Sequence, residues 1–266
     1  MKNMVLKDRT AIVYGGGGAI GSTVARAFAQ AGANVFLAGR SQARLEKTSA
    51  GIRNAGGSAE WATVDALDEE AVTAHAANVA AKTGSIDIAF NAVGLAHVQG
   101  VPFTSLTAAD FLYPVTAYAR TYFITAQAAA RHMKPGGVIM MLSTPGSKMA
   151  GTGFFGYGVS CAATEAMTRL LAAELGAAGI RAVCIRPHAI PQAAAAGSHS
   201  RDVFEPAAKE AGITVTEMLE GAAQTTLIKR LPTLDEVAQA AVFAASSTMG
   251  SMTGAVINLS GGVILD

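Results

Sequence analysis

The chain has 266 residues, of which 51% are hydrophobic and 15% are charged, and its 20 basic and 19 acidic side chains give a net charge of +1. This length suits one large α/β domain with an extensive core, and the composition excludes a disordered chain. The balanced charge removes any strong electrostatic case for binding nucleic acid, so we expect no nucleic-acid partner.

Apolar residues are frequent, yet they form no segment suited to a membrane. Mean hydropathy is +0.35, but no stretch reaches the roughly 18 consecutive apolar residues that span a bilayer. Residues 1–9 lack the apolar core of a signal peptide. Cys161 and Cys184 are too few for a disulfide framework. We therefore expect a cytoplasmic protein with no membrane partner and with reduced thiols.

Short apolar segments alternate with helix-compatible segments along the whole chain. The apolar segment 11–14 runs into the glycine-rich turn 15–21, and a helix follows at about 22–31. The same alternation predicts strands at 34–38, 59–64, 86–90, 138–142, 180–185 and 255–259, and helices at 41–55, 68–82, 108–132, 157–175 and 234–245. Seven strands joined by crossovers predict an α/β, single-domain Rossmann fold over 1–266, a doubly wound seven-stranded parallel sheet with helices on both faces.

Two further features belong to the second half of the chain. In the helix predicted at 157–175, Glu165 and Arg169 are four residues apart, a spacing that favours an ion pair. Residues 189–231 carry few strand signals and follow the carboxyl end of a strand. We predict that this segment forms a lid over the ligand. The alternative is an ordinary surface excursion with short helices.

The glycine cluster after the first strand is typical of a phosphate-binding turn. Glycine lets the backbone approach a pyrophosphate closely, and the following helix offers unpaired N–H groups. The turn lies between a predicted strand and a predicted helix, which is the context that supports dinucleotide binding. We therefore expect the cofactor to contact Gly15, Gly17, Gly18, Ile20 and Gly21.

The end of the second strand bears on which dinucleotide binds. An acidic side chain here usually holds the ribose 2′-hydroxyl of NAD, whereas an Arg accommodates the 2′-phosphate of NADP. Neither Ala38 nor Gly39 is acidic, and Arg40 and Ser41 come next. NADP(H) is favoured and NAD(H) remains possible, while a solvated Arg at a helix start is the plain alternative.

Taken together, these motifs resemble the short-chain dehydrogenase/reductase family over nearly the whole chain. The segment Tyr14–Gly21 is similar to the family's T-G-x-x-x-G-x-G turn, with Tyr in place of Thr and Ala in place of the middle Gly. Its N-N-A-G segment resembles Asn91-Ala92-Val93-Gly94, and Arg230–Ala238 and Thr253–Gly262 are similar to its closing stretch. The resemblance implies that Asp65, with Ala66, lies at the adenine and that Asn91, Ala92, Gly94, Tyr157 and Pro187 also contact the cofactor.

The resemblance also implies a mechanism, in which a Tyr exchanges the substrate proton while hydride moves to or from the nicotinamide. Tyr157 occupies that position, and Ser143 or Thr144 would hold the carbonyl oxygen. A Lys four residues later would lower the Tyr pKa, because a phenol titrates near 10 unaided. In this chain that residue is Cys161. The tetrad is incomplete.

Two more positions depart from the family pattern. The Asn of the long helix is replaced by Tyr118, and the Gly after Pro187 is replaced by His188. His188 is a candidate acid or base, and Cys161 beside a His is a weaker candidate nucleophile, with a packed helix thiol as its alternative. We expect no metal ion at this site.

The predicted substrate pocket is apolar and aromatic, with five candidate lining residues: Val93, Tyr118, Met149, Phe154 and Phe155. Such a pocket suits a small hydrophobic carbonyl or alcohol. We therefore predict an NADP(H)-dependent oxidoreductase. A cofactor-binding protein without hydride transfer is one alternative, and dehydration or isomerisation by Tyr157 and His188 is another. The resemblance also implies a homotetramer, which the small residues of 126–130 would suit by allowing close helix packing.

Overall fold

Seven parallel strands form a sheet in the computed structural model, which describes residues 4–266. The strand order is β3-β2-β1-β4-β5-β6-β7. The strands are β1 (Thr10–Tyr14), β2 (Asn34–Gly39), β3 (Ser58–Thr63), β4 (Ile86–Asn91), β5 (Met133–Leu142), β6 (Arg181–Pro187) and β7 (Ala255–Leu259). The predicted doubly wound Rossmann fold is confirmed. Of the amino-terminal stretch 1–9, the first three residues lie outside the described part.

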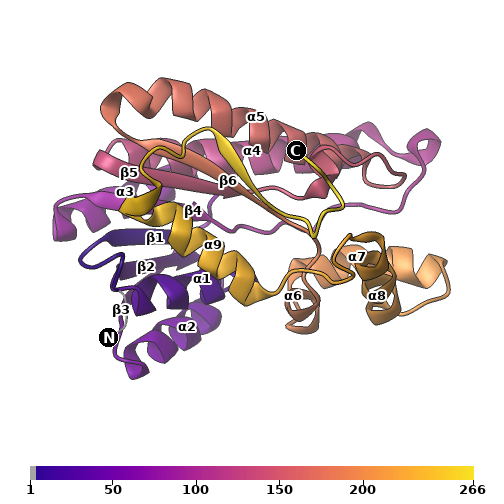
Figure 1. The fold of residues 1–266 in the computed structure, drawn as a ribbon, viewed down its shortest axis with the longest axis horizontal. Helices are drawn as coiled ribbons and strands as arrows, with labels where there is room; N and C mark the ends of the chain where they lie inside the picture. Colours follow the sequence, from indigo (N-terminus) through magenta and orange to yellow (C-terminus); the bar gives the residue numbers. More distant parts are fainter. Residues whose placement is uncertain (1–3) are drawn as a thin grey trace.

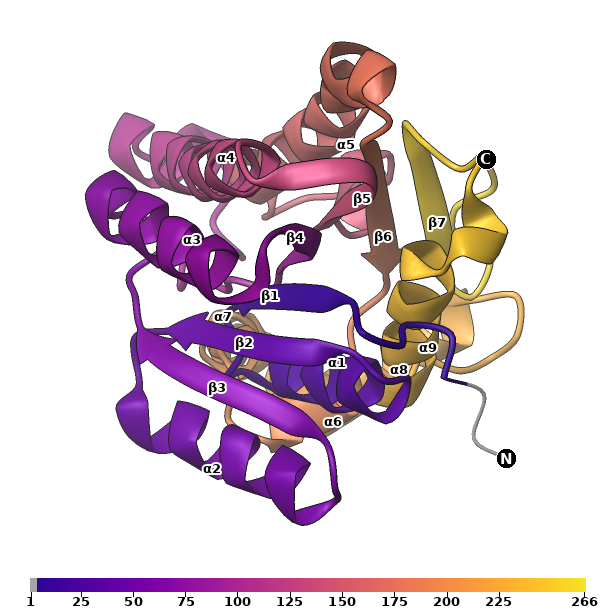
Figure 2. The same ribbon diagram turned by 90° about the vertical axis from the view of Figure 1, so that its left-hand side faces the viewer.

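Helices cover both faces of this sheet, as Figures 1 and 2 show. One face carries α3 (Glu69–Thr83), α4 (Ala108–Ala130) and α5 (Phe155–Leu175). The other face carries α1 (Ala19–Gln30), α2 (Gln42–Asn54) and α9 (Leu234–Ala245). Because both faces are covered, the central strands are rich in apolar residues, and every residue of β1 is buried.

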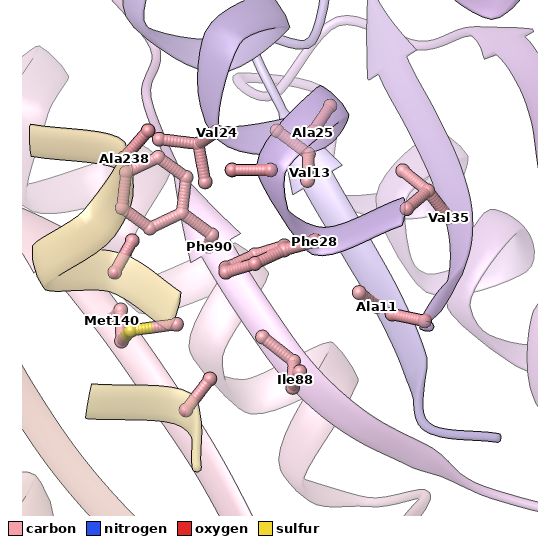
Figure 3. Close-up of a cluster of buried hydrophobic side chains, with 14 of the residues drawn as sticks. Ala11, Val13, Val24, Ala25, Phe28, Val35, Ile88, Phe90, Met140 and Ala238 are labelled. Atoms are coloured by element: carbon pink, nitrogen blue, oxygen red, sulfur yellow. The ribbon is translucent and has the colours of Figure 1, made fainter. Parts of the chain in front are cut away.

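The core between the sheet and α1 is organised around two aromatic rings (Figure 3). Phe28 of α1 and Phe90 of β4 meet edge to face, with ring centroids 6.3 Å apart. Both side chains are fully buried. Their contact fixes α1 across the β1–β4 junction, which is where the strand order reverses and where such sheets bind ligands.

Element boundaries differ from the predictions mainly beside glycines. Helix α1 begins at Ala19, three residues before the predicted start, because Gly18 takes the extended N-cap conformation. Strand β5 begins at Met133 rather than at residue 138, and its pairing with β4 shifts register before Val138, where Gly136 has a φ of 92°. The sequence pattern missed this part of β5 because its solvent-facing residues carry no apolar signal.

The segment between β6 and α9 folds into three short helices, α6 (Pro191–Ala195), α7 (His199–Glu210) and α8 (Val215–Thr225). They lie together beyond the carboxyl end of β6 (Figure 1). The far end of the segment is fastened to the turn after β7, where the Leu227 N–H donates to the Gly261 carbonyl at 2.9 Å. Its role as a lid stays a prediction. Within residues 4–266, no helix is long and apolar enough to cross a bilayer.

Candidate functional site

A cavity of about 590 Å³ opens at the carboxyl ends of the strands. One end is lined by the glycine turn after β1 and by residues that follow β2. The other end is lined by residues after β4, β5 and β6, by the start of α5, and by α6 and α7. Thirteen of the predicted site residues line it: Gly15, Gly17, Gly18, Ile20, Arg40, Ser41, Ala92, Gly94, Ser143, Thr144, Tyr157, Pro187 and His188.

The glycine turn has room for glycine alone at its key positions. Gly15 has φ +75°, and a Cβ there would lie 2.5 Å from the Ala92 carbonyl oxygen. A Cβ on Gly21 would overlap the Gly15 carbonyl group. Within the described chain no side chain caps the start of α1, so its first N–H groups remain available to an anion. These features fit the pyrophosphate of a dinucleotide.

Two basic side chains flank the mouth of the cavity at the end of β2. Arg40 and Arg44 are both exposed and both line the cavity, with Ser41 between them. Arg44 packs against the glycine turn, because a Cβ on Gly17 would lie 2.8 Å from the Arg44 Cβ. The sequence analysis overlooked Arg44. Arg44 could have been predicted as a second basic residue of the site, because it follows Arg40 by four residues at the start of a predicted helix, a spacing that places side chains next to each other.

Among the described residues, four predicted cofactor contacts lie outside the cavity lining: Gly21, Asp65, Ala66 and Asn91. Asn91 is instead buried as a brace of the turn after β4. Its amide donates to the Thr125 hydroxyl at 2.9 Å, and its carbonyl oxygen accepts from the Val93 N–H at 2.9 Å. Asn91 therefore shapes the turn that presents Ala92 and Gly94 to the cavity.

Tyr157 stands at the cavity beside a thiol rather than a cation. Burial raises the pKa of the Tyr157 phenol well above its ordinary value, and Cys161 adds to that rise, while the Thr144 hydroxyl opposes it. Burial also raises the pKa of the Cys161 thiol, and its sulfur lies 3.3 Å from the Thr144 hydroxyl oxygen. Neither group is ionised near neutral pH. Nothing in this trio supplies the positive charge that would make the phenol acidic.

Ser143 lies in the cavity wall, but its hydroxyl belongs to a buried network. Ser143 donates to Glu165 at 2.8 Å, and Ser147 donates to the same oxygen at 2.6 Å. Because a hydroxyl has a single hydrogen, Ser143 in this arrangement does not donate to a substrate carbonyl. Thr144 is able to do so when the Cys161 thiol is the donor in their 3.3 Å contact.

The predicted Glu165–Arg169 pair is wrong, because Glu165 faces inward. It is 5% exposed and pairs with the fully buried Arg186 of β6 at 3.2 Å. Arg186 also pairs with Asp266, which in turn pairs with Lys148 at 2.5 Å. A buried guanidinium needs charged partners, and Glu165 of α5 supplies one to Arg186 of β6. The network ties the loop that carries Thr144 to strand β6, which His188 directly follows.

Three histidines line the cavity, and two of them were not predicted. His97 comes from the loop after β4, His188 from the end of β6 and His199 from the first residue of α7. Burial lowers the pKa of all three imidazoles, that of His199 to about 4. Neither His97 nor His199 belongs to a recognisable sequence motif, since only the folded chain brings them together.

The predicted aromatic lining is mostly placed in the cavity wall, with one correction. Val93, Tyr118, Met149 and Phe154 all line the cavity. Phe155 points outward instead, is 51% exposed, and packs against Phe103 and Phe111. Phe154 is the N-cap of α5 and Phe155 is its first helical residue, and their side chains point in different directions.

Comparison with known proteins places this geometry among dinucleotide-dependent enzymes. A family model described as "Enoyl-(Acyl carrier protein) reductase" matches residues 17–264. A (+)-borneol dehydrogenase from Salvia officinalis is 31% identical over 97% of this chain and 94% of its own length. The crystal structure of a dehydrogenase/reductase from Sinorhizobium meliloti superposes with a TM-score of 0.85 at 24% identity, covering 99% of this chain and 98% of its own. A short-chain dehydrogenase from Burkholderia cenocepacia, solved in complex with NADP, has a TM-score of 0.81 at 26% identity, covering 97% of this chain and 98% of its own.

Proposed function

Because the chain belongs to the short-chain dehydrogenase/reductase family of oxidoreductases, we propose that it is NADP(H)-dependent and acts on a lipophilic carbonyl or alcohol. The observation that carries the proposal is the single cavity running from the glycine turn to Tyr157. Such a cavity brings a dinucleotide bound at one end within reach of a substrate bound at the other.

The preference for NADP(H) rests on charge at the mouth of the cavity. Arg40 and Arg44 lie on either side of Ser41, and a 2′-phosphate placed there would receive two guanidinium partners. No acidic side chain among the described cavity residues flanks this position; Asp202 lines the cavity from α7, at the other end. The Burkholderia cenocepacia relative was solved with NADP, which agrees with the same preference.

The proposal of a lipophilic substrate rests on the residues at the opposite end of the cavity. Tyr118, Met149 and Phe154 form an apolar wall there, while Thr144 and the imidazoles of His97 and His188 supply a few polar groups. A pocket of this kind orients an apolar ligand through one or two hydrogen bonds. A bound nicotinamide dinucleotide would supply or accept hydride, and Thr144 would hold the substrate oxygen beside Tyr157.

Titration of the purified protein with NADPH and NADH, followed by fluorescence, tests the cofactor proposal. We expect NADPH to bind at least about 10-fold more tightly than NADH, as one or two charge-assisted hydrogen bonds would provide. A screen of lipophilic ketones and alcohols then tests turnover. Tight NADPH binding without turnover would favour a cofactor-binding protein that transfers no hydride, and equal affinity for both dinucleotides would refute the NADP(H) preference.

A further inference from the structure

His97 occupies a defined position against the candidate acid–base residue. Its ring stacks on that of Tyr157 with centroids 4.4 Å apart and planes 20° apart, and it meets Tyr118 edge to face at 6.0 Å. It lines the same cavity as Thr144. The stacking orders the imidazole without using either of its nitrogens.

Two hydrogen bonds define which nitrogen of His97 carries the proton. Nδ1 lies 2.7 Å from the Leu95 carbonyl oxygen, and a carbonyl only accepts, so Nδ1 is the protonated nitrogen. Nε2 lies 2.8 Å from the Gln99 amide nitrogen, which donates to it. The neutral imidazole therefore presents a lone pair at Nε2, and a substrate hydroxyl is able to replace the Gln99 amide as its donor.

His188 has the opposite arrangement. Its Nδ1 accepts the Ala189 N–H at 2.7 Å, so in the neutral ring Nε2 carries the proton. His188 is thus a hydrogen-bond donor to the cavity and is already occupied at its accepting nitrogen. The two imidazoles differ in what they offer a ligand oxygen, and His97 is the one that offers a base.

The other candidate residues are less suited to exchange a proton with the substrate. The Tyr157 phenol has Cys161 where a cation would lower its pKa, and its ring is parallel to His97, so the two side chains do not exchange a proton directly. Ser143 donates to Glu165. His199 does not accept a proton readily near neutral pH, because burial and the facing His97 lower its pKa to about 4.

We propose that His97, through Nε2, is the catalytic residue that exchanges the proton of the substrate oxygen. The inference rests on the proposed function. In oxidation, the substrate C–H bond breaks and its electron pair leaves as hydride to the oxidised nicotinamide. The O–H proton passes to Nε2, and the oxygen lone pair forms the C=O bond. In reduction, hydride adds to the carbonyl carbon and Nε2–H returns the proton to the oxygen.

The surroundings of His97 set the expected pH dependence. Burial lowers its pKa, and the hydrogen bond to Leu95 partly offsets that effect. His199 faces it from α7, with Asp202 near His199, while Tyr118 and Tyr157 face it from α4 and α5. The imidazole is consequently neutral at pH 7. Oxidation should accelerate as pH rises through the pKa of His97 and then level off, and reduction should slow over the same interval.

Two variants separate catalysis from structure. His97→Phe keeps the ring stack on Tyr157, whereas His97→Asn keeps a side-chain N–H for the Leu95 carbonyl. With NADPH and a ketone turned over by the wild type, we expect kcat to fall roughly 100-fold or more in both, the range of general acid–base catalysis. NADPH affinity should be unchanged, and the pH dependence of kcat should disappear. His132→Gln, at the end of α4, is the control and should behave as wild type.

A measurement independent of turnover completes the test. Two-dimensional ¹H–¹⁵N spectra of the histidine side chains distinguish the two neutral tautomers, and His97→Phe assigns the signal. An Nδ1–H tautomer supports the proposal, and an Nε2–H tautomer overturns it. Turnover and an unchanged pH profile in both variants would overturn it while the proposed function stands. If wild type binds NADPH but reduces no ketone, both ideas fall together.

Discussion

The imidazole of His199 lies against the bare Cα of Gly94, where the side chain of any other residue would stand. A Cβ on Gly94 would overlap the ring at Nδ1 and Cε1. The first residue of α7 is thereby seated on the turn that follows β4. This contact packs the start of α7 against the loop after β4, at the wall of the cavity.

Gly94→Ala should push α7 away from the turn. An added methyl group at a filled position costs about 1–3 kcal/mol when the neighbours have to move. We expect a lower midpoint of urea unfolding, together with faster hydrogen exchange confined to α6 and α7. Gly51→Ala is the matched control, because its Cβ meets no described atom within 4 Å. That substitution lies inside α2 and should stabilise the protein by roughly 0.5–1 kcal/mol. Equal exchange in both variants would show that Gly94 does not hold the segment.

Arg40→Ala should weaken NADPH binding by roughly 10-fold while leaving NADH binding within about two-fold. The physical reason is the loss of one charge-assisted contact to the 2′-phosphate, which NADH lacks. Arg44→Ala should act in the same direction. Arg53→Ala, further along α2 and outside the cavity lining, is the control. Isothermal titration with each dinucleotide measures the change, and a parallel loss of NADH affinity would indicate general damage to the site.

Glu165→Leu should be among the most destabilising single changes in the chain. It would leave the buried Arg186 without its interior carboxylate, and breaking a buried pair in this way costs about 3–5 kcal/mol. Adding Arg186→Met should restore much of the loss, because the pair is then removed as a whole. Urea unfolding of the single and double variants measures both. A double variant no more stable than Glu165→Leu would show that the charge is not the cause.

Stability should fall as pH drops from about 6.5 to 4. Burial lowers the pKa of His75 and of His199 to about 4 in the folded state, below the ordinary 6.5, so the unfolded chain binds protons first. The stabilisation is present above pH 6.5 and is lost progressively toward pH 4. At about 1.4 kcal/mol per pKa unit, each histidine contributes at most roughly 3.5 kcal/mol. His75→Phe should flatten this part of the pH profile of urea unfolding, and an unchanged slope would contradict the assignment.

Cys161→Lys should lower the pKa of the Tyr157 phenol by placing a cation beside it. Ultraviolet titration of the phenolate detects the change. Subtracting the titration of the double variant Cys161→Lys/Tyr157→Phe from that of Cys161→Lys isolates the signal of the Tyr157 phenol. We expect a shift of at least about one unit, worth about 1.4 kcal/mol. If Tyr157 takes part in turnover, the single variant should also be faster near neutral pH. An unshifted phenol would mean that residue 161 does not face it.

Local patterns predicted the fold well because the determinants are local. Neighbouring residues were enough to predict the strand at 11–14, the glycine turn after it and Arg40 as a site residue. The structure places the glycine turn and Arg40 together at the cavity. The rest of the site depends on contacts between residues that are far apart in the sequence. Glu165 was assigned to Arg169 by helical spacing, yet it pairs across the core with Arg186. His97 and His199 are about a hundred residues apart in the chain, so no spacing rule could join them.

The part of the cavity wall built by α6 and α7 belongs to one connection between β6 and α9, which also contains α8. Its ends are anchored, while each doubling of a flexible loop costs only about 0.6 kcal/mol. Ile190 and Ala193 pack into the main core, so we expect the sheet and the glycine turn to tolerate insertions and deletions only beyond α6. Under the proposed function, a laboratory library confined to α6 and α7 should therefore alter the range of substrates while NADPH affinity stays near that of the wild type.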